Sequence, residues 1–220
     1  MRLGAAFLAL MLLFSISCSS VASSPTYMQE PEREVRITEY KDEEDIAWLW
    51  ETLLTYTGDE RITAGILGYY WRESFCKSNA TTHWPTVNPY LGRDIPVEFT
   101  ARIDEGLTDG SSRDDFLTEV HEQIGGYGLG QWYSRHFLEA FYDFARSWGT
   151  SIGDAEMQCA FAVESIKSYT ELWEELLSIE DPNLAGARIG LIYDGSSSGY
   201  CAIAAMAESF YYKYADADGA

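Results

Sequence analysis

The sequence predicts a mainly α fold, with one small β-hairpin at most. Apolar residues recur at helical spacing in clusters that extend from residue 46 to residue 214. No segment alternates apolar and polar residues over the length of a strand, although a hairpin fits between Asn79 and Val97. A chain of 220 residues with 46% hydrophobic residues supplies enough apolar side chains for one core. We therefore expect a single domain.

The N-terminus has the pattern of an export signal. Arg2 precedes an apolar run from Gly4 to Phe14, which is shorter than the roughly 20 residues that a membrane-spanning helix needs. Two processing routes remain open. Cleavage after Ala22 would release a secreted protein, whereas lipidation of Cys18 would keep it attached to the cell surface.

These signals divide the chain into three parts. Residues 1–22 are predicted to be the signal peptide, residues 23–41 a polar tether and residues 42–216 the folded domain. Helices are expected over 44–57, 60–74, 97–105, 113–124 and 137–148, from Asp154 through Phe161, and over 203–214. Gly149 is a suitable end for the fifth of these helices, and Asp154 is a suitable N-cap for the sixth.

Between the predicted helices lies a glycine-rich turn, residues 125–132, with the sequence GGYGLGQW. Four glycines in eight positions exclude the interior of a helix and allow a ligand to approach the backbone closely. The pattern therefore predicts a binding turn.

Charge and residue types exclude several classes of function. The net charge of −20 makes nucleic acid an improbable partner, because phosphate binding relies on clustered Lys and Arg. The same charge weakens adhesion to anionic walls.

His83, His121 and His136 lack metal-ligand spacing, so we expect neither a metal nor another cofactor. For an exported chain, Cys76, Cys159 and Cys201 suggest one disulfide and one free thiol, with all three pairings open.

Glu73 occupies an unusual position for a charged residue. It follows Tyr70 by three residues, Tyr69 by four and Ile66 by seven, which places it on the apolar face of its predicted helix. Burial and the partial negative charge at a helix C-terminus both disfavour the ionised form and would raise the pKa of Glu73. A glutamic acid that keeps its proton near neutral pH is suited to general-acid cleavage of a glycoside.

The order of several motifs resembles that of the phage tail-type lysozyme family. The resemblance rests on GILG and ES in residues 65–74, on FTARIDEG in residues 99–106, on GYGLGQW in residues 126–132, and on SIGD with MQ in residues 151–158. It covers about residues 60–168 and continues more weakly to residue 214. The chain departs from the common family pattern at Tyr69 and Tyr133, where relatives have Asn and Thr.

The resemblance implies a lysozyme-like fold, related to goose-type lysozymes and soluble lytic transglycosylases. It also implies cleavage of peptidoglycan between N-acetylmuramic acid and N-acetylglucosamine, with Glu73 as the acid, by a protein that we expect to be a monomer. The residues that would bind the sugars are Ser74, Tyr127, Gly128, Gln131 and Trp132. The ring of Tyr127 or Trp132 would stack on a sugar face.

A hydrolase of this type needs a second carboxylate, and we favour Asp104 because it lies between Glu73 and the glycine-rich turn. The other candidates are Asp94, Glu98, Glu105 and Glu164, the last of which is expected to pair with Arg135 or Arg146 instead. Without a second carboxylate, the same Glu would support lytic transglycosylation. A lysozyme-like wall-binding protein without activity and a secreted toxin or inhibitor are the alternatives from other classes.

Overall fold

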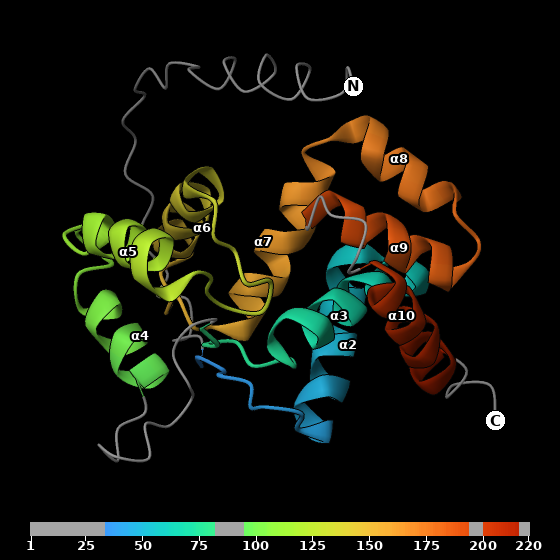
Figure 1. Cartoon of the computed structure of the whole chain (residues 1–220), viewed down its shortest axis with the longest axis horizontal. Helices are drawn as coiled ribbons and strands as arrows, with labels where there is room; N and C mark the ends of the chain where they lie inside the picture. The colour runs from blue at the N-terminus through green and yellow to red at the C-terminus, as the bar shows by residue number, and fades with distance from the viewer. Residues whose placement is uncertain (1–33, 82–94, 194–199, 216–220) are drawn as a thin grey trace, which may run out of the picture. The chain divides into compact units, whose positions relative to one another are not determined.

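Helices form nearly all the regular structure that is described, as the sequence predicted (Figure 1). The structure is a computed structural model that describes residues 34–81, 95–193 and 200–215. The helices are α2 (Glu43–Thr57), α3 (Glu60–Ser74), α4 (Ile95–Glu105), α5 (Arg113–Glu119), η2 (Val120–Ile124), α6 (Arg135–Trp148), α7 (Ala155–Lys167), α8 (Thr170–Ser178), α9 (Pro182–Tyr193) and α10 (Tyr200–Tyr214). The described residues contain no strand, only two isolated bridges that both involve Tyr127. The hairpin expected between Asn79 and Val97 falls largely on residues 82–94, outside the described residues.

Capping residues set several helix ends where the sequence predicted them. The Asp154 carboxylate accepts a hydrogen bond of 3.0 Å from the backbone N–H of Glu156 and so caps the start of α7. Gly149 ends α6 in the left-handed conformation, with φ of 74°. None of the described helices has the length and apolar character needed to cross a membrane.

The helix predicted over residues 113–124 is divided in two. The α-helical part, α5, ends at Glu119, and the chain continues as the π-helix η2. At its end the Gly125 N–H donates to the carbonyl of Val120, five residues earlier, at 2.9 Å. This wider turn leads directly into the glycine-rich turn.

Helix α3 is the central element of the fold, in contact with α2, α9 and α10 (Figure 1). The sequence predicted one apolar face on this helix, but every residue from 62 to 70 is buried, so all its faces are covered. Close packing depends on Gly68: a Cβ atom there would lie 2.8 Å from the carbonyl oxygen of Ile203 and 2.9 Å from the backbone nitrogen of Ala207. The missing side chain lets α10 lie directly against α3.

A second group of elements, α4, α5, α6 and the glycine-rich turn, packs around aromatic side chains. The ring of Phe116 lies 5.9 Å from that of Phe141 and 5.9 Å from that of Tyr127, measured between centroids. Helix α7 contacts both α2 and α6 and so links this group to the helices around α3. Glu73 lies on α3, in the group formed by α2, α3, α9 and α10, whereas the glycine-rich turn belongs to the second group.

Residues 34–41, here called the N-terminal segment, pack against the domain. Within this segment Thr38 is fully buried, and its hydroxyl donates to the carbonyl of Cys76 at 2.6 Å. The backbone N–H of Lys41 donates to the carbonyl of Phe75 at 3.0 Å. The compact unit accordingly begins at Glu34. The predicted tether therefore divides: residues 34–41 belong to the folded unit, and residues 23–33 lie outside the described residues.

The expected disulfide is absent, and Cys76, Cys159 and Cys201 are all free thiols. Cys201 is exposed on α10, whereas Cys76 and Cys159 are buried in the core, so Cys201 is not placed to pair with either. Burial raises the pKa of both Cys76 and Cys159. Because the thiolate is the reactive form, these two cysteines act as small core residues.

Candidate active site

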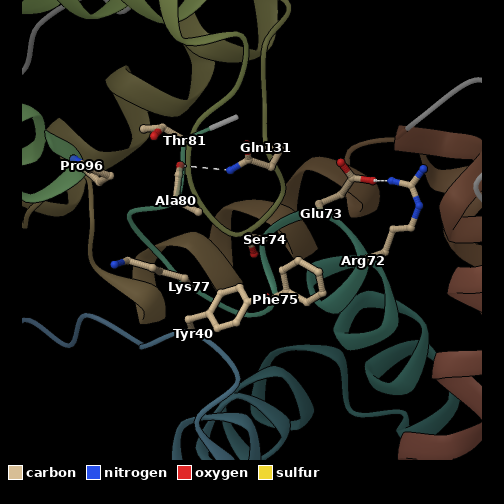
Figure 2. Close-up of a pocket in the computed structure, with 10 residues that line it drawn as sticks. All are labelled: Tyr40, Arg72, Glu73, Ser74, Phe75, Lys77, Ala80, Thr81, Pro96 and Gln131. Atoms are coloured by element: carbon tan, nitrogen blue, oxygen red, sulfur yellow. Dashed lines mark hydrogen bonds and ion pairs between the residues drawn. The ribbon is translucent and has the colours of Figure 1, made fainter. Parts of the chain in front are cut away.

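A cavity of about 310 Å³ opens where α3 ends (Figure 2). Its walls come from the N-terminal segment, the end of α3, the following turn over residues 75–81, the start of α4 and the glycine-rich turn. The described residues that line it are Tyr40, Arg72, Glu73, Ser74, Phe75, Lys77, Ala80, Thr81, Pro96 and Gln131. The cavity volume lies near the lower end of the range for ligand sites, about 300 to 1,000 Å³.

Glu73 lies on the cavity wall in the last turn of α3. Its side chain is 20% exposed, and its carboxylate forms an ion pair with the guanidinium of Arg72, which is 36% exposed. Figure 2 shows the two groups side by side at one end of the lining. Among the described lining residues, Glu73 is the only carboxylate.

Ser74 and Tyr69 attach the end of α3 to the glycine-rich turn. The buried Ser74 hydroxyl lies 2.9 Å from the carbonyl of Leu129 and 3.0 Å from that of Tyr70. The Tyr69 hydroxyl donates to the carbonyl of Gly130 at 2.5 Å. Tyr69, one of the two departures from the family pattern, is therefore a buried link between α3 and the turn.

The glycine-rich turn is narrow and rigidly hydrogen-bonded. Tyr127 and Trp132 exchange two backbone hydrogen bonds of 3.1 Å each. The Gln131 amide nitrogen donates to the carbonyls of Ala80 and Gly128 at 3.0 and 2.8 Å, so it holds the turn against residue 80. Gly128 has φ of 80°, a conformation that L-residues with a side chain rarely adopt.

Tyr127 and Trp132, which were expected to offer a ring face to a sugar, are both buried. Tyr127 is fully buried with its hydroxyl 2.6 Å from the Thr100 hydroxyl, and Trp132 is 3% exposed. The Trp132 ring packs 5.0 Å from Phe141 and 5.3 Å from Phe161, between centroids. Both aromatic side chains pack into the core, and Gln131 is the residue of the turn that lines the cavity.

Asp104, the predicted second carboxylate, is not among the residues that line the cavity. Its two oxygens accept hydrogen bonds from the Ser151 hydroxyl at 2.6 Å and from the Ile152 N–H at 2.9 Å. Burial raises the pKa of Asp104, an effect that these hydrogen bonds oppose. In this position Asp104 fixes the turn before α7.

The other candidates for a second carboxylate also lie outside the described lining. Glu98, Glu105 and Glu164 are exposed, and Asp94 lies outside the described residues. The expected ion pair of Glu164 is also absent. Arg135 pairs instead with Glu139 at 3.3 Å, and Arg146 donates to the carbonyl of Thr108 at 3.2 Å.

Sequence reasoning missed three lining residues that give the cavity its chemistry. Tyr40 is 52% exposed, and its ring lies 4.9 Å from that of Phe75, so an open aromatic surface borders the cavity. Lys77 brings a positive charge on a side chain that is only 4% exposed. No local pattern marks these residues, because the N-terminal segment was expected to be a tether and the turn after α3 has no periodicity.

Backbone strain is concentrated at this cavity. In the described residues, the non-glycine residues with positive φ are Lys41 at 55°, Phe75 at 52°, Cys76 at 65° and Gln131 at 46°. Phe75 and Gln131 line the cavity, and the other two are neighbours of lining residues. Each such residue costs on the order of 1 to 3 kcal/mol, and strain of this kind collects at functional sites. The hydrogen bonds from the N-terminal segment to the carbonyls of Phe75 and Cys76 hold two of these residues in place.

Comparison with known proteins gave a match to the model of one protein family. The comparisons with curated proteins and with solved structures gave no match. The model of a protein family described as phage tail lysozyme matches residues 48–214, which include α3, the glycine-rich turn and α10. At the family level this match indicates a domain that lyses peptidoglycan. Because the match covers most of the chain, the chain belongs to the phage tail lysozyme family.

Proposed function

We propose that this protein cleaves the glycan strands of peptidoglycan between N-acetylmuramic acid and N-acetylglucosamine, with Glu73 as the general acid. The observation that carries the proposal is the position of Glu73. Among the described lining residues it is the carboxylate. It lies in the last turn of α3, whose residues 62–70 are buried on all sides, and the neighbouring Ser74 hydrogen-bonds to the glycine-rich turn. A proton donor of a glycosidase has to be fixed in this way relative to the bond that breaks.

Arg72 is part of this proposal. A general acid must carry its proton when the glycosidic bond breaks, whereas an adjacent guanidinium favours the carboxylate. The Arg72 side chain is 36% exposed, and we expect it to turn away from Glu73 when a sugar occupies the cavity. The carboxyl group of Glu73 then protonates the oxygen of the leaving sugar. Afterwards the carboxylate removes a proton from the group that attacks the muramic acid.

That attacking group is either water or a hydroxyl of the muramic acid itself. Attack by water gives hydrolysis and normally uses a second carboxylate. Asp104 was the candidate for that role, but its two oxygens accept hydrogen bonds from the turn before α7. Internal attack gives a 1,6-anhydro sugar and needs only Glu73, first as acid and then as base. We favour this single-carboxylate route, because Glu73 is the only carboxylate among the described lining residues. We also propose that the protein acts outside the cytoplasmic membrane after export.

Digestion of purified peptidoglycan tests the proposal. We expect soluble muropeptides from the wild-type protein and at least a thousandfold slower release from Glu73→Gln, because the amide can neither give up nor accept the proton. Mass spectrometry separates the two routes, since anhydro products are one water lighter than hydrolysis products. Glu139→Gln, which removes a carboxylate paired with Arg135 on α6, is the matched control.

Equal release by Glu73→Gln and the wild type would contradict the assignment of Glu73. Binding to walls without any released fragment would favour an inactive wall-binding protein. Thermal unfolding of each variant shows whether the fold is intact. We expect it to be, because a partly exposed ion pair contributes at most about 1 kcal/mol.

A further inference from the structure

Lys77 is buried at the wall of the same cavity. Its side chain is only 4% exposed, although lysine is among the residues least often buried. In Figure 2 it lies on the side of Pro96, away from Glu73 and Arg72, with Ser74 and Gln131 between the two ends. The cavity therefore has an acid at one end and an ammonium group at the other.

The charge of Lys77 is only weakly compensated by the protein. Its ion partner among the described residues is Glu39, whose carboxylate oxygen lies 3.7 Å from Nζ, beyond hydrogen-bond distance. The Glu39 side chain is 66% exposed, so water screens its charge. A buried ammonium group is costly to keep unless it is hydrogen-bonded. A ligand anion in the cavity would supply the stronger partner.

Three positively charged side chains at or beside this cavity favour the binding of an anion, although the protein as a whole is acidic. The chain has 35 acidic residues and 15 Lys and Arg, yet Lys41, Arg72 and Lys77 lie at or beside the cavity. Lys41 Nζ lies 4.4 Å from the ring centroid of Phe75 and 4.9 Å from that of Tyr40. Since the chain carries a net charge of −20, a cluster of cations favours this cavity as the place where a negative group of the substrate lies.

We propose that Lys77 is a specificity-determining residue that binds a carboxylate of the glycan substrate. This inference rests on the proposed function and names the substrate feature that the site selects. A sugar ring would lie against Tyr40 and Phe75, with its carboxylate directed to Lys77 and its glycosidic bond toward Glu73. In peptidoglycan this carboxylate comes either from the lactyl group of a muramic acid that has lost its stem peptide or from the stem peptide itself, and chitin has neither.

The test measures binding in the Glu73→Gln background, so that cleavage is not required. The probes are three tetrasaccharides: a neutral chitin oligomer, a peptide-free muramic acid oligomer, and the same oligomer with stem peptides. We expect Lys77→Met to weaken binding of a carboxylate-bearing probe about tenfold, which corresponds to about 1.4 kcal/mol. Binding of the chitin oligomer should stay within twofold. Lys77→Arg should retain most of the affinity, because it keeps the positive charge.

The pattern of losses distinguishes the two sources of the carboxylate. A loss for the peptide-free oligomer identifies the lactyl group, whereas a loss only for the peptide-bearing oligomer identifies the stem peptide. Lys213→Met is the matched control, because Lys213 also pairs with a glutamate, Glu43, but on the surface of α10. It should change none of the affinities.

A second measurement leaves Lys77 unchanged and therefore does not depend on how its variants fold. The methyl ester of the lactyl group and the amidated stem peptide should each bind less tightly than the free acid if that carboxylate contacts Lys77. Equal binding of neutral and carboxylate-bearing probes, or equal losses for both in Lys77→Met, would overturn the inference. Cleavage by the wild type without this discrimination rejects the role of Lys77 alone. Discrimination without cleavage rejects the proposed activity alone. Absence of both binding and cleavage rejects both.

Discussion

The carboxylate of Asp104 accepts two hydrogen bonds from the turn that precedes α7, and burial raises the pKa of Asp104 above its ordinary value of 3.8. The folded protein therefore binds this proton more tightly than the unfolded chain does. It follows that the contribution of Asp104 to stability falls as the pH rises from about 3.8 through the raised pKa of the folded state. A structural role and a catalytic role for Asp104 make different predictions.

Replacement of Asp104 by Asn should leave peptidoglycan cleavage within about threefold of the wild type, because Asp104 does not line the cavity. The variant should also lack the part of the pH dependence that this group causes. Urea unfolding between pH 4 and pH 7 measures it: the free energy of unfolding of the wild type should fall relative to that of Asp104→Asn as the pH rises. A variant that is folded but has lost cleavage would indicate that Asp104 has a catalytic role.

At the scale of the helix, periodic sequence patterns predicted where helices begin and end, whereas side-chain directions in the irregular turns could not be predicted. The periodic residues of α3 and its flanking signals gave its limits, Glu60–Ser74, and Gly149 and Asp154 gave a helix end and a helix start. The burial of Trp132 was not predicted, because the direction of a side chain in a tight turn depends on hydrogen bonds that have no periodic pattern. Even within α3, the sequence did not reveal that all faces are covered.

The close approach of α10 to α3 predicts how a side chain added at Gly68 changes the stability of the protein. In Gly68→Ala the new methyl group would lie 2.8 Å from the Ile203 carbonyl oxygen, and backbone atoms cannot yield as a side chain can. We expect a loss of about 1 to 3 kcal/mol or more in the free energy of unfolding, because the packing around the helix is overfilled. Gly65→Ala is the comparison, since its nearest contact is the flexible end of the Ile189 side chain at 2.5 Å.

Denaturant unfolding of the two variants checks this expectation. Gly68→Ala should be the less stable of the two, and its cleavage activity should fall because α3 carries Glu73. Equal stabilities would mean that α10 moves as easily as one side chain does. The assumed close fit between α3 and α10 would then be incorrect.

At the scale of the whole molecule, the candidate site depends on contacts between distant parts of the chain. Tyr40 and Lys77 are far apart in the sequence and line one cavity because Thr38 and Lys41 bond to the turn after α3. Sequence patterns are local, so they identified Glu73 and the glycine-rich turn but not the wall that faces them. The same limitation explains why residues 34–41 were predicted to be a tether.

Removal of the N-terminal segment tests this long-range dependence. A chain that begins at Asp42 loses the buried Thr38 and the hydrogen bonds to the carbonyls of Phe75 and Cys76, each worth about 1 kcal/mol. For a domain of this size each kcal/mol lowers the Tm by about 2 to 4 °C, so we expect a clear decrease together with loss of cleavage. A chain that begins at Glu34 should match the full-length chain in both. If the chain that begins at Asp42 matched it as well, the segment would have no part in the site.

The contact between α3 and α10 also bears on how the protein comes to be active during synthesis. The helix that carries Glu73 packs against α2, α9 and α10, and it gains α10 only when Tyr200–Tyr214 has left the ribosome. A chain that a premature stop or a protease shortens before this point leaves one side of α3 open to water. Such a fragment carries Glu73 without one of the surfaces that fix α3, so we expect it to lack the proposed activity.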